Sequence, residues 1–144
     1  MLNATLPLSA PAKTMALYDL AKDHGHTVEC FQMHRPAISI EEEGKCYIAL
    51  RPDLTGSQER EALAHELGHC ESGGFYYRSD PHDIKSRHEF RANKWAFLRL
   101  LPPGWVRNCI KRGICAVYSI AEEAGVSCEF ASKALSYYHD IGII

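Results

Sequence analysis

Apolar side chains recur at helical spacing along three segments of the chain. The pattern predicts helices over Thr14–His24, over the residues that follow Ser57, and over Asp83–Leu101. In the third segment the apolar positions are Phe90, Trp95, Ala96, Phe97, Leu98, Leu100 and Leu101. Pro102 follows directly and would end this helix, because proline cannot take part in the backbone hydrogen bonding of a helix interior.

Between the first two helices, β-branched and aromatic residues predict short strands. The expected strands are Thr27–Phe31, Ala37–Ile40 and Cys46–Leu50. Residues 41–45 read Glu-Glu-Glu-Gly-Lys, and a polar join that contains glycine is typical of a hairpin. We therefore expect an α+β fold that is mostly helical, with a small three-stranded antiparallel sheet beside the second helix.

A helix, a turn and a second helix are predicted over residues 120–138, with Ser127 as the N-cap of the second helix. This second helix offers only Lys133 as a cation, and Glu129 near its start would repel phosphate, which argues against direct nucleic-acid binding. Because 144 residues suit a single domain, we expect a core at residues 1–105 and a helical hairpin at 106–144 that packs on it.

The second predicted helix contains an H-E-x-x-H run formed by His65, Glu66 and His69. Residues four apart project from one face of a helix, so the two imidazoles can converge on one metal ion. The glutamate between them is not a ligand. It lies near the open coordination position, where it can take a proton from water. The alternative is a helix that places two histidines one turn apart by chance.

A hydrolytic zinc site usually has three protein ligands and one water, so a third ligand must come from elsewhere. Glu89 is our candidate. It shares one face of the third helix with alanines that would let two helices approach closely, and with Asn93, which could orient a ligand. His82, His88 and Cys70 are rival ligands by residue type. Their positions favour surface histidines and a small buried cysteine instead, since adjacent helical residues point about 100° apart.

These residues carry a resemblance to the ImmA/IrrE family of metallopeptidases. The two matching stretches are His65-Glu66-Leu67-Gly68-His69-Cys70 and Glu89-Phe90-Arg91-Ala92-Asn93-Lys94-Trp95-Ala96-Phe97-Leu98-Arg99-Leu100-Leu101-Pro102. Trp95 stands where the family usually has phenylalanine, and the resemblance extends loosely over residues 15–140. It implies a minimal zincin-like domain in which His65, His69 and Glu89 bind zinc and Glu66 is the general base. It also implies a phage or mobile-element protein that cleaves a transcriptional repressor.

The segment that joins the two motif helices contains further candidate donors. Tyr76, Tyr77 or Arg78 could stabilise the oxyanion of a tetrahedral intermediate. The alternative, which we favour, is that the aromatic residues of this segment simply pack the loop.

Composition changes this picture little. With 16 basic and 18 acidic residues, the formal net charge of −2 gives no overall bias toward nucleic acid. Residues 1–12 resemble neither a signal peptide nor a membrane span. The cysteines show no C-x-x-C pair, and their irregular spacing suggests neither a disulfide framework nor a second zinc site; they are Cys30, Cys46, Cys70, Cys109, Cys115 and Cys128. A reducing cytoplasm is the compartment that this usage favours.

The sequence therefore predicts a cytoplasmic zinc endopeptidase with no membrane partner, and the family resemblance implies that its protein substrate is a helix-turn-helix repressor. Two alternatives remain open. One is a DNA-binding regulator that keeps a non-catalytic metal site, and the other is a toxin–antitoxin-type module that binds its partner without cutting it.

Overall fold

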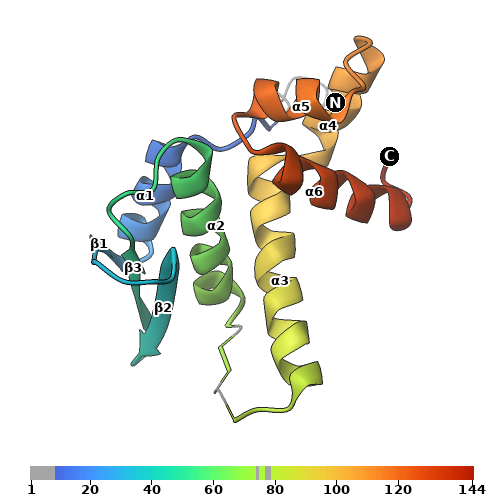
Figure 1. The fold of residues 1–144 in the computed structure, drawn as a ribbon. Coiled ribbons are helices and arrows are strands. Elements are labelled where there is room, and N and C mark those ends of the chain that lie inside the picture. Colours follow the sequence, from blue (N-terminus) through green and yellow to red (C-terminus); the bar gives the residue numbers. More distant parts are fainter. Residues whose placement is uncertain (1–8, 74, 77–78) are drawn as a thin grey trace, which may run out of the picture.

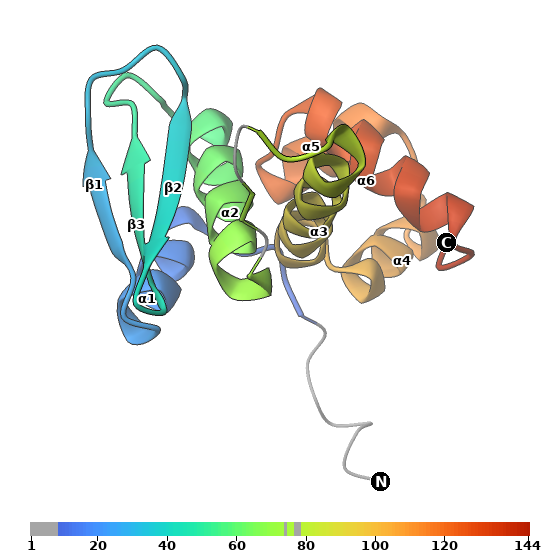
Figure 2. The same cartoon turned by 90° about the horizontal axis from the view of Figure 1, so that it is seen from below.

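The computed structural model describes residues 9–73, 75–76 and 79–144. The elements run in the order α1 (Thr14–Asp23), β1 (Thr27–Cys30), β2 (Ala37–Glu42), β3 (Lys45–Leu50), α2 (Ser57–Ser72), α3 (His82–Leu100), α4 (Pro103–Lys111), α5 (Val117–Ala124) and α6 (Cys128–Asp140). Helix α2 lies between the small sheet on one side and α3 on the other (Figures 1 and 2). The predicted α+β class and the three predicted helices up to residue 101 are confirmed.

The sheet has the order β1-β3-β2, with β1 parallel and β2 antiparallel to β3. The expectation of a purely antiparallel sheet is therefore wrong. The chain reverses between β1 and β2, and again at Glu43-Gly44, so that β3 runs in the direction of β1. Strand β3 takes the centre because its alternating apolar side chains give it the most buried face, at Cys46, Ile48 and Leu50.

The hairpin between β2 and β3 was predicted and is confirmed. Its two-residue turn consists of Glu43 and Gly44, with φ of 53° and 80°. Positive φ at both central residues is typical of the tight turns whose twist matches that of the flanking strands. The hairpin leaves β2 at one edge of the sheet, next to α2.

Helices α2 and α3 approach each other closely where Gly68 faces Ala92. Leu63, Ala64 and Leu67 of α2 are fully buried, as are Ala92 and Leu100 of α3. The small residues on the facing surfaces allow this approach, as the sequence predicted for the alanines of α3. The two motif helices are thus held at a short separation.

Helix α4 was not predicted from the sequence pattern. Pro102 follows α3, and Pro103 occupies the first turn of α4, where the missing N–H of proline costs no hydrogen bond. Val106 and Cys109 anchor α4 in the same buried cluster as α2 and α3. The prolines therefore end one helix and also begin the next.

The predicted helix-turn-helix corresponds to α5 and α6. Gly125, at φ 74°, closes α5, and the Ser127 hydroxyl accepts a hydrogen bond from the Phe130 N–H at 3.1 Å as predicted for the N-cap of α6. The fully buried Tyr138 donates its hydroxyl to the Leu101 carbonyl at 2.7 Å. This hydrogen bond ties α6 to the end of α3.

A disulfide joins Cys46 of β3 to Cys70 of α2, with a Cα–Cα distance of 5.9 Å. Cys70 is therefore not simply the small buried cysteine that was predicted, since it forms a disulfide that the irregular spacing of the cysteines did not suggest. The pairing depends on how β3 packs against α2, which the spacing of the cysteines along the chain does not show. The cysteines consequently give no argument for a reducing compartment.

Within the described residues, no helix has the length and hydropathy required to cross a bilayer.

Candidate metal centre

The structure brings together the three residues that the sequence singled out as ligands. His65 and His69 project from one face of α2, and Glu89 faces them from α3. The two Nε2 atoms are 3.2 Å apart, Glu89 Oε1 lies 3.1 Å from His65 Nε2, and Glu89 Oε2 lies 2.8 Å from His69 Nε2. Two helices thus present two imidazoles and one carboxylate to a single point.

These separations fit a set of ligands around one zinc ion. Zinc binds histidine nitrogen and carboxylate oxygen at about 2.0–2.2 Å, so two ligands at a tetrahedral angle are roughly 3.3 Å apart. The three observed separations lie between 2.8 and 3.2 Å. The donor types are also those that zinc prefers, and three protein ligands leave one position for water.

Asn93 orients His65. Its Oδ1 atom lies 2.9 Å from His65 Nδ1, one helical turn beyond Glu89 on α3. An amide oxygen accepts a hydrogen bond, so the imidazole carries its proton on Nδ1 and keeps a lone pair on Nε2, which faces Glu89. Such a hydrogen bond behind a metal ligand fixes both the tautomer and the ring plane.

Glu66 is buried beside the cluster, with 9% of its surface exposed. The Ser39 hydroxyl of β2 donates a hydrogen bond to Glu66 Oε1 at 2.6 Å. The sequence analysis missed Ser39. Strand alternation was the available signal, because Ser39 shares a strand face with the buried Ala37 while Ile38 points the other way. A polar residue on the covered face of a strand needs a partner, and here the partner is Glu66.

The imidazoles of His65 and His69, which contact the two oxygens of Glu89, hold the pKa of Glu89 well below its usual value, despite the opposing effect of partial burial. The carboxylate is therefore charged at neutral pH.

Tyr76 donates its hydroxyl to Glu89 Oε2 at 3.1 Å. Burial, and then the charge of Glu89, raise the pKa of Tyr76, so the phenol remains a hydrogen-bond donor at neutral pH. Tyr77 and Arg78, the other candidate oxyanion donors, lie outside the described residues.

A cleft of about 160 Å³ opens over these residues. Its walls come from α2, from β2, from Phe75 and Tyr76, and from Arg35 in the segment before β2. A second cavity of about 430 Å³ lies on the other flank of His65 and Glu66, and Arg35 lines it as well. The sequence analysis also missed Arg35, which no motif marks.

The rival ligands lie apart from this cluster. His88 stacks on the ring of Tyr76 with 6.1 Å between ring centroids, and its buried Nδ1 has no hydrogen-bond partner within the described part of the chain. His82 is exposed and contacts Ser86 on the same helix at 3.3 Å. Cys70 points to the sheet, where it bonds to Cys46.

A family model confirms the resemblance that the motifs indicated. The model for the IrrE N-terminal-like domain (Peptidase_M78) matches residues 21–136, and the chain belongs to this family of ImmA/IrrE metallopeptidases. Membership supports a metallopeptidase-type activity on a protein substrate and implies a bound metal. No protein with a curated description matches the chain.

Proposed function

We propose that the chain is a zinc-dependent endopeptidase that hydrolyses a peptide bond in one specific protein partner, a helix-turn-helix repressor of a phage or mobile element. The observation that carries this proposal is the convergence of His65, His69 and Glu89 within 4.8 Å of one another, with the buried Glu66 beside them. A histidine pair on one helix and a carboxylate on the next, flanked by an edge strand, is the arrangement of a zincin-like core.

His65, His69 and Glu89 would hold the zinc ion. When bound there, zinc supplies a Lewis acid that polarises the scissile carbonyl and acidifies a water molecule. The chain's own contribution is to keep three ligands at tetrahedral spacing before the ion arrives. Asn93 adds to this by presenting the lone pair of His65 Nε2 to the site.

Glu66 is the general base in this proposal. It accepts a proton from the attacking water and later delivers that proton to the leaving amine. Ser39 holds one oxygen of the carboxylate at 2.6 Å, which leaves the other oxygen for the water. Because β2 supplies Ser39, the strand that would bind the substrate also positions the base.

The substrate lies along β2, the edge strand beside α2. An extended peptide can pair with the free edge of this strand and so hold its scissile carbonyl at the cluster. The 160 Å³ cleft and the 430 Å³ cavity both border His65 and Glu66. The substrate polypeptide can therefore extend from the site on both sides of the scissile bond. This favours cleavage within a chain over trimming of its ends. Tyr76 and Arg35 line the same cleft, and we assign them as the donors to a developing oxyanion.

We treat residues 1–144 as one domain, in which residues 1–105 carry the chemistry and the helical hairpin within 106–144 packs on them and contacts the protein partner. Lys133 of α6 is paired with Glu129 at 3.2 Å, so α6 offers little free positive charge to a phosphate backbone. This favours a protein partner over an operator. Since repressors act on DNA, we place the reaction in the cytoplasm.

Purified zinc-loaded protein, incubated with the helix-turn-helix repressor encoded beside its gene, tests the proposal. We expect two repressor fragments by mass spectrometry, and no fragments with the Glu66→Gln variant, which should bind zinc and the repressor as the wild type does. Repressor binding without cleavage by the wild type would instead support the interaction module. A mobility shift of upstream DNA that persists after metal removal would support the regulator.

A further inference from the structure

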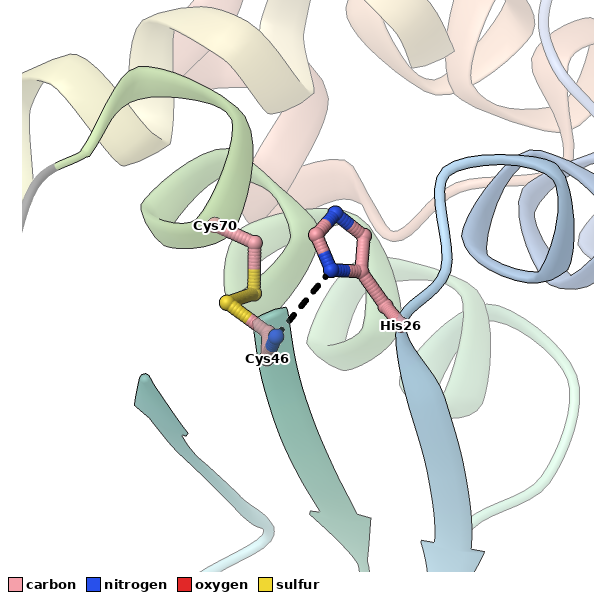
Figure 3. Close-up of side chains that lie close together, drawn as sticks. All are labelled: His26, Cys46 and Cys70. Carbon is pink, nitrogen blue, oxygen red and sulfur yellow. Dashed lines mark hydrogen bonds between the residues drawn. A yellow bond between two sulfur atoms is a disulfide. The ribbon is translucent and has the colours of Figure 1, made fainter. Parts of the chain in front are cut away.

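A second cluster of metal-ligating side chains lies on the side of α2 that faces the sheet. His26 just before β1, Cys46 on β3 and Cys70 on α2 bring one ligand atom each within 4.8 Å of one another (Figure 3). Cys70 follows His69 directly, and one residue is about 100° of helical rotation, so Cys70 faces the sheet while His69 faces α3. The cluster is therefore separate from the candidate metal centre.

These side chains are well shielded from solvent. Cys46 is 1% exposed, the side chain of His26 is 6% exposed, and Cys70 is partly buried. A disulfide whose only role is to link a strand covalently to a helix does not require a neighbouring imidazole. A buried imidazole whose lone pair lies beside two sulfurs, in contrast, is a donor set that zinc prefers.

The hydrogen bonds of His26 determine which of its nitrogens carries that lone pair. The Cys46 backbone N–H can only donate, and it lies 3.2 Å from His26 Nδ1 (Figure 3). Nδ1 is therefore the acceptor, and the ring proton sits on Nε2. Nε2 in turn lies 3.1 Å from Glu71 Oε2, while the other oxygen of Glu71 contacts His24 Nδ1 at 2.6 Å. A histidine that donates its far N–H to a carboxylate is the usual form of a metal-binding histidine.

We propose that the reduced chain has a second metal site, in which Cys46 Sγ, Cys70 Sγ and His26 Nδ1 bind a thiophilic divalent ion of the zinc class. Three protein ligands leave the fourth position to water. Glu71, held between His24 and His26, supports the site by fixing the imidazole. The disulfide is the form of this site that cannot bind an ion, because neither sulfur then carries a free thiolate.

The interconversion of the two forms is balanced. A dithiol reductant gives two electrons and two protons to the disulfide, becomes a disulfide itself, and leaves two thiols on the protein. Both thiols lose their protons to water as the divalent ion binds, and His26 Nδ1 exchanges its hydrogen bond from the Cys46 N–H for the bond to the ion. The sulfurs must then separate to roughly 3.8 Å, the spacing of two tetrahedral ligands at about 2.3 Å from zinc, while their Cα atoms start 5.9 Å apart. Re-oxidation by a disulfide oxidant reverses both steps and releases the ion.

Cobalt(II) is the probe that separates this site from the candidate metal centre. Thiolate ligands give cobalt a strong near-ultraviolet charge-transfer absorption, whereas two imidazoles and a carboxylate give none. The full-length protein would be reduced with a phosphine, freed of reductant without oxygen, and titrated with cobalt. We expect the thiolate absorption and one more cobalt per chain in the reduced protein than in the disulfide form.

Variants then assign the ligands. Cys46→Ser and Cys70→Ser should each abolish the absorption, and His26→Ala should weaken cobalt binding at least about tenfold. The matched control replaces three exposed free cysteines, Cys30, Cys115 and Cys128, by serine and should keep the absorption. The disulfide form of the wild type is a second control that needs no mutation.

Several results would overturn the proposal. One is the lack of thiolate absorption in the reduced wild type, whether or not that chain remains folded. Another is absorption that survives in the Cys46→Ser and Cys70→Ser variants. Unchanged affinity in His26→Ala would remove the imidazole from the site. None of these readouts depends on peptidase activity, so the proposed function and this site can fail separately.

Discussion

Gly68 of α2 lies directly against the backbone of Ala92 on α3. A β-carbon at position 68 would be 2.5 Å from the Ala92 carbonyl oxygen and 2.9 Å from its Cα, which is closer than atoms can pack. Gly68 directly precedes His69, and Ala92 lies one turn after Glu89. The two helices therefore meet at the same level as the three candidate ligands, and the glycine of the H-E-x-x-H run sets their separation.

Gly68→Ala should push the helices apart. In an ordinary helix interior this substitution stabilises by about 1 kcal/mol, because alanine is the better helix former. Here the added methyl group would meet the backbone of Ala92, which cannot move away as a flexible side chain could. We therefore expect a loss of about 1–3 kcal/mol in the free energy of unfolding, together with weaker zinc binding. Denaturant unfolding and a zinc titration measure the two effects. A variant at least as stable as the wild type would show that the close approach is not needed.

Ser39→Ala should separate positioning from metal binding. Without the 2.6 Å hydrogen bond, Glu66 is free to turn away from the attacking water, and we expect kcat to fall roughly tenfold with KM and zinc content unchanged. Ser39→Thr keeps a hydroxyl at the same position and should restore most of the rate. If both variants lose the same activity, the effect comes from strand packing and not from the hydrogen bond.

Asn93→Ala should weaken zinc binding without removing a ligand. The imidazole of His65 loses the acceptor at 2.9 Å that fixes its tautomer and plane, and losses of this kind usually cost about 10–100-fold in metal affinity. The matched control is Lys94→Ala, an exposed neighbour on the same helix. Competition with a chelator measures the affinity. Equal affinities for the two variants would refute the role of Asn93.

Glu61 joins the motif helix to the C-terminal hairpin. Its two carboxylate oxygens accept hydrogen bonds from the Ser127 N–H at 2.7 Å and the Ser127 hydroxyl at 2.9 Å, at the start of α6. Glu61→Gln keeps the shape but removes the charge, and we expect it to lower the free energy of unfolding by about 1–2 kcal/mol. Glu123→Gln removes the same charge from an exposed position of α5 and should change stability by less than about 0.5 kcal/mol.

Much of the site could be predicted from the sequence because it lies on two helices. Helical periodicity places His65 and His69 on one face, and it groups Glu89 with Asn93 on the face of α3 that carries small residues. Each of these relationships is local to one helix. The structure brings the two faces together where the close contact at Gly68 allows it.

Features that depend on long-range packing could not be predicted in the same way. The hydrogen bond from Ser39 to Glu66 spans 27 residues, and the Cys46–Cys70 disulfide spans 24. The parallel pairing of β1 with β3 depends on which strand takes the centre of the sheet, which hairpin signals do not determine. Helix α4 was not predicted because Pro102 and Pro103 indicated only the end of α3. Proline is also common in the first turn of a helix, and Pro103 begins α4.

The claim that His65, His69 and Glu89 hold zinc has one direct test, an anomalous difference map recorded at the zinc absorption edge from crystals of zinc-loaded protein. The account predicts a single strong peak at about 2.0–2.2 Å from both Nε2 atoms and from a carboxylate oxygen of Glu89 in the disulfide form of the chain. Metal-replete crystals with no peak between α2 and α3, or with Glu89 turned away from the two imidazoles, would contradict it.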